Sequence, residues 1–280
     1  MKSKAMLILF GCVGTATTWA SPIIYANNAG EPHIDVIDGA TMTVTSDFLI
    51  NGGSGNGRGV VVVGDTLYYT LANSGTVFKH NLLTNAEGTA FTVAGASGLS
   101  TIAYDGADFW IGDYSGTNQA YHYTPTGTLL STVHLGNCTG FCDGLEFFLQ
   151  NGQGRLISNR GDSEIGPYDV YDTSGNLVQA AFITTTFGAT GIAFDGTNFW
   201  VSDRTSQKLA LYNGTTGALI SDRTITGTTF GLNVEDLSVD YTLVLPPPTG
   251  VPEPSTWLLL SSGLGLVLLV SRRRRFENLS

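Results

Sequence analysis

The sequence predicts an all-β fold, a β-propeller of about five four-stranded blades, flanked by an N-terminal signal helix and a C-terminal transmembrane helix. The first observation is composition: 36 glycines, 10% aromatic residues and only 13% charged residues are typical of many short strands joined by tight turns. The second is a repeat, because "IAYDGADFWIGDY" (102–114) returns as "IAFDGTNFWVSDR" (192–204) with the same residue at more than half of the positions. The third is the regular spacing of the repeats.

Each repeat is predicted to form a β-hairpin, because Asp-Gly or Asn-Gly between two apolar runs favours a two-residue turn. Three more segments fit this pattern: 60–73, 145–159 and, less clearly, 235–245. The turn residues are Asp65, Asp105, Asn151, Asp195 and Asp240, which stand 40, 46, 44 and 45 residues apart. A period of about 40–50 residues with four strands is the signature of propeller blades.

A second strand-turn-strand unit follows each of the first four hairpins, at 77–93, 120–133, 168–182 and 209–225. A fifth copy, at 33–48, precedes them all, and the last hairpin, 231–245, has no copy after it. We therefore expect 231–245 and 33–48 to complete one blade together, which leaves no sheet edge open. Five inner and five outer halves make five blades, and a sixth requires a degenerate unit in 49–58.

The charge distribution excludes nucleic acid as a partner. The formal net charge is −10, and residues 21–250 hold seven Lys or Arg against twenty-one Asp or Glu. Such an acidic body would repel phosphates and offers no basic stripe. The basic residues gather at the two ends of the chain.

The N-terminus has the pattern of a secretory signal peptide. Lys2 and Lys4 precede an apolar run, and small residues lead to a cleavage site between Ala20 and Ser21. An alternative is a lipoprotein signal ending at Cys12, although Phe10 fits that motif poorly.

Near the C-terminus, residues 257–270 carry no charge. As a helix these fourteen residues reach ~21 Å, short of the ~30 Å bilayer core. The flanking residues must therefore extend the span, and the predicted transmembrane helix covers 255–271. The arginines after it should remain in the cytoplasm, which places the body outside.

The whole segment "VPEPSTWLLL…RRRR" resembles the PEP-CTERM sorting signal of Gram-negative bacteria. Its elements are a Pro-Glu-Pro triplet, an apolar helix and an arginine cluster: Pro252, Glu253, Pro254, Arg272, Arg273, Arg274 and Arg275. The resemblance implies recognition by an exosortase, a membrane protease-transpeptidase. Cleavage near the triplet would move the protein from an inner-membrane intermediate to the cell surface or to exopolysaccharide. The alternative is an ordinary C-terminal membrane anchor.

The repeats also resemble NHL-type propeller repeats over roughly 58–245, a likeness that bears on architecture and says little about activity. The predicted segments are then a signal peptide (1–20), a linker (21–32), the propeller (33–245), a proline-rich linker (246–250), the sorting signal (251–275) and a tail (276–280).

Three polar residues stand at equivalent strand ends: Asp113, Asn159 and Asp203. We interpret them as turn caps. The alternative is a ring of oxygen ligands for Ca²⁺, joined by Glu146 and Glu235 from the channel side. Propeller lactonases hold a metal in that region, but their full ligand set is not identifiable here. We therefore predict no catalytic residue, no metal and no cofactor, with Ca²⁺ as the alternative.

Other residues have similar pairs of interpretations. Trp110 and Trp200 share a strand position, which favours packing between blades over a sugar-stacking surface. Cys138 and Cys142 favour a disulfide in an oxidising compartment, and the alternative is a metal site that includes His134. His80 and His122 fall in outer strands, where we expect a surface role.

These observations predict an exported protein of the cell surface or extracellular matrix whose propeller binds a ligand or partner. It is not predicted to be an enzyme. The alternatives are a metal-dependent hydrolase of the lactonase type and a purely structural matrix protein.

Overall fold

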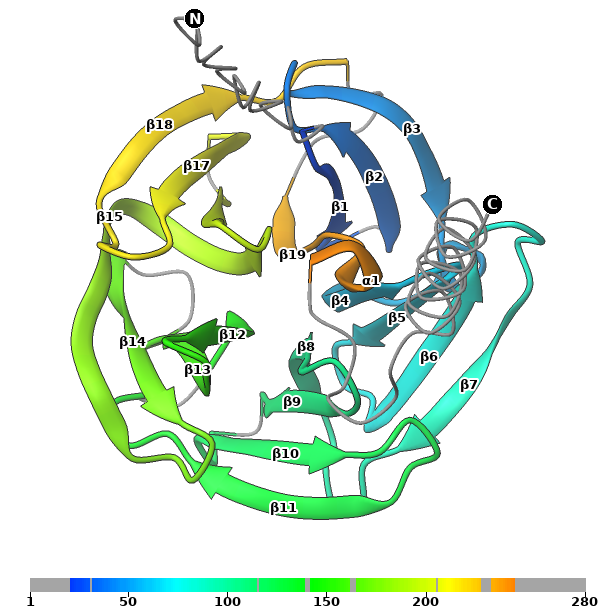
Figure 1. Cartoon of the computed structure of the whole chain (residues 1–280). Coiled ribbons are helices and arrows are strands. Elements are labelled where there is room, and N and C mark those ends of the chain that lie inside the picture. The colour runs from blue at the N-terminus through cyan, green and yellow to red at the C-terminus, as the bar shows by residue number, and fades with distance from the viewer. Residues whose placement is uncertain are drawn as a thin grey trace, which may run out of the picture.

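The computed structural model describes residues 21–30, 32–114, 116–138, 142–161, 165–204, 206–227 and 233–244. Nearly all regular structure in these ranges is antiparallel β-sheet, and the sheets stand around a central axis (Figure 1). Among these residues no helix has the length and apolar character needed to cross a bilayer. The predicted signal peptide, the sorting residues and the 255–271 helix lie outside the described residues.

Two four-stranded sheets confirm the predicted pairing of an inner hairpin with an outer one. Their strands are β4 (Gly57–Val63), β5 (Thr66–Leu71), β6 (Thr76–Asn81) and β7 (Glu87–Thr92), then β8 (Leu99–Tyr104), β9 (Phe109–Asp113), β10 (Gln119–Tyr123) and β11 (Leu129–His134). In each sheet the strands follow one another in chain order. The segment before β4 forms a 3-10 turn, η1 (Asn51–Gly53).

A seven-stranded sheet contains the next two repeats. It consists of β12 (Leu145–Gln150), β13 (Gln153–Asn159), β14 (Ile165–Asp172), β15 (Leu177–Phe194), β16 (Asn198–Asp203), β17 (Lys208–Asn213) and β18 (Leu219–Thr224). The 18-residue strand β15 joins the two repeats, because its first part pairs with β14 and its last part with β16. One continuous strand therefore runs from the outer edge of one repeat to the inner edge of the next.

The fourth sheet joins the two ends of the described chain, as the repeat pattern predicted. Its order is β19 (Val234–Ser238), β1 (Ile23–Asn28), β2 (His33–Asp38) and β3 (Thr43–Leu49). In this sheet β1 pairs with β19 from Tyr25–Ser238 to Asn28–Val234. Segments more than 200 residues apart in sequence thus close the ring (Figure 1).

The division of this sheet between the two ends differs from the prediction in two places. Residues 21–32 are not a linker, because they contain β1, whose Ile24 and Ala26 are fully buried. The hairpin predicted at 235–245 does not form within the described residues 235–244, because β19 is followed by a short helix, α1 (Tyr241–Val244). The Asp240 carboxylate starts this helix by accepting the N–H of Thr242, and it also accepts the N–H of Gly64 in the turn after β4. The predicted turn residue is thus a helix cap.

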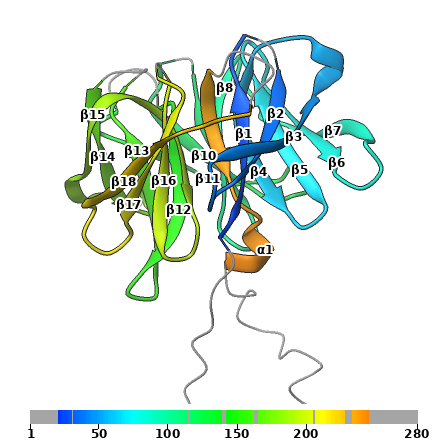
Figure 2. The same ribbon diagram turned by 90° about the horizontal axis from the view of Figure 1, so that it is seen from above.

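Neighbouring inner strands approach one another closely. A Cβ at Gly144 would lie 1.9 Å from the carbonyl oxygen of Thr190, and a Cβ at Gly191 would lie 2.5 Å from Cα of Asp236. Glycine is required at both positions for this reason. The short helix α1 lies at one end of the ring (Figure 2).

Candidate functional site

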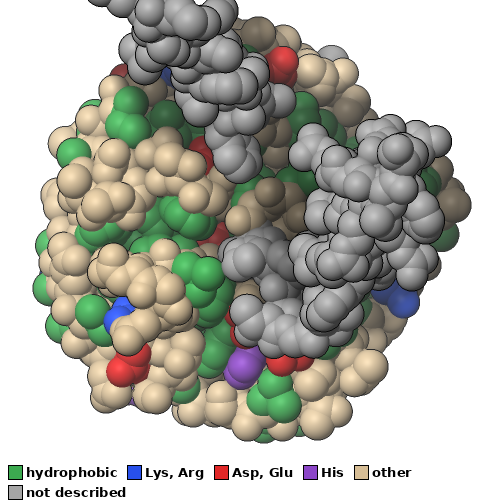
Figure 3. Space-filling view, viewed as in Figure 1, with side chains coloured by type: hydrophobic (Ala, Val, Ile, Leu, Met, Phe, Trp, Pro, Cys, Tyr) green, Lys and Arg blue, Asp and Glu red, His purple; other side chains and the backbone are tan. Residues whose placement is uncertain are grey.

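A cleft of about 460 Å³ lies where the β8–β11 sheet meets the strands β12–β14. Its walls are formed by Asp105, Trp110, His122, Ser131, Phe147, Gly154 and Thr173. The first four come from the β8–β11 sheet and the last three from the next repeat along the chain. In the space-filling view a histidine and several acidic side chains lie close together on the face shown (Figure 3).

Asp105 begins the turn between β8 and β9 and organises it. One carboxylate oxygen accepts the backbone N–H groups of Ala107 and Asp108 at 3.0 and 2.8 Å. The other accepts the indole N–H of Trp110 at 3.1 Å. This arrangement explains why the repeat carries an aspartate five residues before a tryptophan.

The turn between β15 and β16 has the same construction. Asp195 accepts the backbone N–H groups of Thr197 and Asn198 at 2.9 and 2.8 Å and the indole N–H of Trp200 at 2.9 Å. We call this second turn the sister turn. It serves as an internal reference for what the fold alone requires.

His122 extends the first turn toward the cleft. It lies opposite Trp110 on β10, and the imidazole stacks on the indole with 4.0 Å between ring centroids and an interplanar angle of 7°. Its Nε2 donates to Asp105 Oδ2 at 3.0 Å, which fixes the tautomer. The side chain is 18% exposed. His122 is thus partly exposed in the cleft wall. The predicted surface role is wrong for His80, which is buried against Glu87.

The pKa values of the two carboxyl groups in this turn, Asp105 and Asp108, shift in opposite directions. Burial acts to raise the pKa of Asp105, but hydrogen bonds from His122 and from the backbone of Asp108 and Ala107 bring it below its usual value. Burial and the charge of Asp105 raise the pKa of Asp108. The cleft wall thus holds an ionised carboxylate, Asp105, beside the imidazole of His122, and Asp108 follows in the same turn.

The three residues predicted as turn caps or Ca²⁺ ligands, Asp113, Asn159 and Asp203, form hydrogen bonds with neighbouring segments. Asp113 accepts hydrogen bonds from Thr117 and Tyr121, and Asp203 accepts one from Ser206. The Asn159 side chain accepts the backbone N–H groups of Asp143 and Gly144 before β12, and it donates to the carbonyl groups of Gly161 after β13 and Ala189 on β15. The backbone contacts of Asn159 agree with the capping interpretation, whereas these contacts of Asp113 and Asp203 join side-chain hydroxyls.

The two glutamates expected near the channel are buried and paired. Glu146 accepts the N–H of Phe147 and that of Phe194 on β15, and it bonds the hydroxyl of Tyr241 on α1. Glu235 forms ion pairs with Arg58 at 3.0 Å and with Arg204 at 3.3 Å. Neither joins a group of three His, Cys, Asp or Glu ligands within the described part of the chain.

Sequence reasoning missed Asp236. This buried residue of β19 accepts the N–H of Val60 on β4 and the hydroxyl of Thr101 on β8. Burial raises its pKa well above the usual value. Its carboxyl group therefore links β19 to β4 and β8. No local sequence pattern predicts this contact.

The cysteines and tryptophans have structural contacts. Cys138 and Cys142 form a disulfide with an S–S distance of 2.06 Å. Trp110 and Trp200 are 2% and 5% exposed, which supports packing over an open sugar-stacking surface.

The sequence and the fold were compared with known proteins. Residues 250–275 match the PEP-CTERM protein-sorting motif. No curated protein is similar enough in sequence to count as a match.

Solved structures share the fold at low sequence identity. A chain of a nidogen/laminin complex aligns with a TM-score of 0.57 at 10% identity, covering 78% of this chain and 97% of that one. A protein of unknown function from Bacteroides caccae gives 0.50 at 13% identity, covering 79% and 99%. Myxococcus xanthus glutaminyl cyclase gives 0.45 at 13% identity, covering 71% and 76%. The motif and the likeness to the nidogen/laminin chain, together with the closed ring of sheets, identify a chain with a PEP-CTERM sorting signal at residues 250–275 and a β-propeller-like body.

Proposed function

We propose that this chain is an exported protein that an exosortase-type enzyme processes and delivers to the cell surface or extracellular matrix, where its propeller binds a ligand. The observation that carries the proposal is the PEP-CTERM motif behind a propeller-like body. Before processing, the segment 255–271 would hold the protein in the inner membrane with the body outside the cytoplasm.

We further propose that the body is a ring of five blades. The seven-stranded sheet supports this count, because β15 serves first as an outer strand and then as an inner one. The segment 49–58 supports it as well, since it holds η1 and the first residues of β4 in place of a sixth unit.

The cleft supports binding of a polar, hydroxyl-rich ligand such as a matrix polysaccharide. Its walls combine hydrogen-bonding groups of Asp105, His122, Ser131 and Thr173 with the aromatic ring of Phe147, a mixture that suits a polar small-molecule site. Binding without catalysis is the proposal we favour over a lactonase-type hydrolase. The inner carboxyls Glu146 and Asp236 support this preference, because strand and helix donors already hold both.

Blocking the cleft should abolish binding to a polysaccharide array. The exposed Thr173 lines the cleft, so Thr173→Trp would obstruct part of it without entering the core. We expect a loss of at least tenfold in signal, whereas Thr126→Trp, at an exposed turn position that does not line the cleft, should bind like the unmodified chain. Equal binding by both variants would contradict a ligand site in the cleft, and no binding by the unmodified chain would favour a purely structural role.

A further inference from the structure

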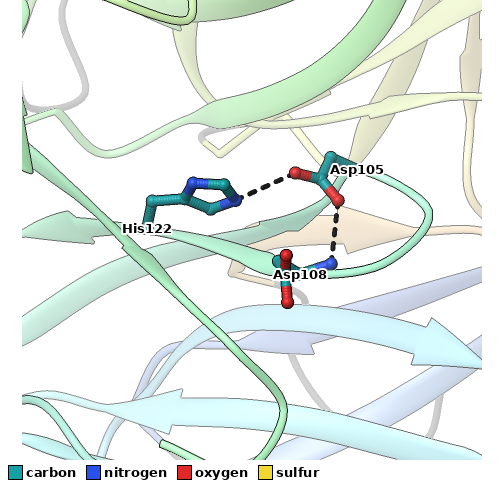
Figure 4. A group of neighbouring side chains, drawn as sticks. All are labelled: Asp105, Asp108 and His122. Carbon is teal, nitrogen blue, oxygen red and sulfur yellow. Dashed lines mark hydrogen bonds and ion pairs between the residues drawn. The ribbon is translucent and has the colours of Figure 1, made fainter. Parts of the chain in front are cut away.

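Three potential metal ligands converge at the edge of the cleft. One ligand atom each from Asp105, Asp108 and His122 lies within 4.8 Å of the other two. The imidazole of His122 and the carboxylate of Asp105 point toward each other, with Asp108 beside them (Figure 4). No other such group of His, Cys, Asp or Glu occurs among the described residues.

The sister turn shows that two of these ligands are not needed by the fold. Asn198 stands where Asp108 would be, three residues after the turn aspartate. Leu211 stands where His122 would be, opposite the tryptophan on the neighbouring strand. The sister turn nevertheless forms the same hydrogen bonds to backbone and indole. Asp108 and His122 are thus additions to a turn that forms without them. They occur in the copy of the turn that borders the cleft.

We propose that Asp105, Asp108 and His122 bind a divalent transition-metal ion, with Zn²⁺ as the best fit. Zinc takes imidazole nitrogen and carboxylate oxygen at about 2.0–2.2 Å, so two ligands at a tetrahedral angle lie roughly 3.3 Å apart. His122 Nε2 and Asp105 Oδ2 are already 3.0 Å apart. An ion can therefore replace the shared proton if this pair separates by about 0.3 Å and the Asp108 carboxylate, whose ligand atom lies within 4.8 Å of the other two, moves closer.

An ion at this position leaves the hydrogen bonds that hold the turn between β8 and β9 intact. The Asp105 oxygen that binds the backbone of Ala107 and Asp108 keeps both bonds. The indole of Trp110 donates to the oxygen that would face the metal and holds its orientation, as outer-shell donors do in metal sites. Imidazole is a poor ligand for Ca²⁺, which prefers six to eight oxygens.

Three protein ligands leave at least one coordination position open, as in zinc sites that take an exogenous ligand. Asp105 and His122 also line the cleft, so the open position would face that space. The metal site goes beyond the proposed function and does not depend on export or on polysaccharide binding. A ligand oxygen could, however, complete its coordination.

The test is calorimetric titration of the full chain, purified in detergent, with Zn²⁺ and separately with Ca²⁺. We expect one Zn²⁺ per chain and no response to Ca²⁺. His122→Leu and Asp108→Asn introduce the residues of the sister turn, so both variants should fold. Each should lower Zn²⁺ affinity by at least about tenfold. Asn198→Asp alone is the matched control, and it should leave affinity and stoichiometry unchanged.

A gain-of-site variant makes the test stricter. Asn198→Asp combined with Leu211→His transfers both ligands to the sister turn and should raise the stoichiometry to two Zn²⁺ per chain. Unchanged Zn²⁺ affinity in His122→Leu and Asp108→Asn would overturn the assignment, and so would a chain that binds no Zn²⁺. A double variant that gains no site would contradict the argument that these residue differences create the site.

Discussion

A chain that ends after Asn233, and so lacks β19 and α1, is expected to lose cooperative folding. It would leave β1 as an open edge, because β19 is the inner partner of β1. It would also remove four buried apolar side chains: Val234, Leu237, Val239 and Tyr241. At roughly 1.5–3 kcal/mol for each buried apolar side chain, this loss approaches the ~5–15 kcal/mol that stabilises a typical domain.

The measurement is urea denaturation followed by tryptophan fluorescence and circular dichroism. A chain that ends after Val244 keeps β19 and α1 and is the matched control, which should unfold in one cooperative transition. A sharp transition in the shorter chain, with a midpoint near that of the control, would show that the ring does not depend on the strand from the C-terminal end.

The second large effect is a fall in stability as the pH rises. Burial raises the pKa of Glu146 to about 8, although hydrogen bonds from Tyr241, Phe147 and Phe194 oppose the rise. Between the ordinary value of 4.5 and about 8, the folded state keeps a proton that the unfolded chain releases. The free energy of unfolding should therefore fall by about 1.4 kcal/mol per pH unit for this group.

Glu146→Gln should remove that contribution, because the amide does not titrate. Denaturation curves recorded across this pH range should show a shallower slope for the variant, with the remainder due to Asp236, whose pKa is also raised. The control is Asp222→Asn, which replaces an exposed carboxylate whose pKa is lowered by its partner Lys208. In this variant the free energy of unfolding should fall with rising pH as it does in the unmodified chain. A Glu146→Gln variant with the slope of the unmodified chain would contradict a buried, protonated Glu146.

The sequence predicted the repeating strands well because each hairpin carries its own turn chemistry. Asp105 and Asp195 each begin an Asp-Gly pair that a Phe-Trp pair follows after two further residues. In the structure each aspartate accepts hydrogen bonds from the backbone of its turn and from its tryptophan. The error at Asp240 has a physical reason. An aspartate that accepts a nearby backbone N–H can begin a short helix as well as a turn, so the residue type alone does not separate the two.

The candidate site was harder to predict because its parts meet only through tertiary register. His122 and Asp105 are 17 residues apart, and they meet because β9 and β10 pair Trp110 with His122. Local pattern cannot supply that register. A signal was nevertheless present in the printed sequence, since a comparison of the two repeats position by position exposes the exchange of Asp108 for Asn198. Glu146 lies on the inner strand β12, and the sequence did not show that its carboxylate would be buried against Phe194 of β15 and Tyr241 of α1.

Mass spectrometry of the mature protein from its native host tests the central claim, export and sorting through the C-terminal motif, most directly. The account predicts a chain that begins at Ser21 and ends near the Pro252–Pro254 triplet, without the arginine cluster. A covalent attachment at the new C-terminus would identify the acceptor. Recovery of a chain with its "SRRRRFENLS" terminus intact would contradict processing and leave a plain membrane anchor.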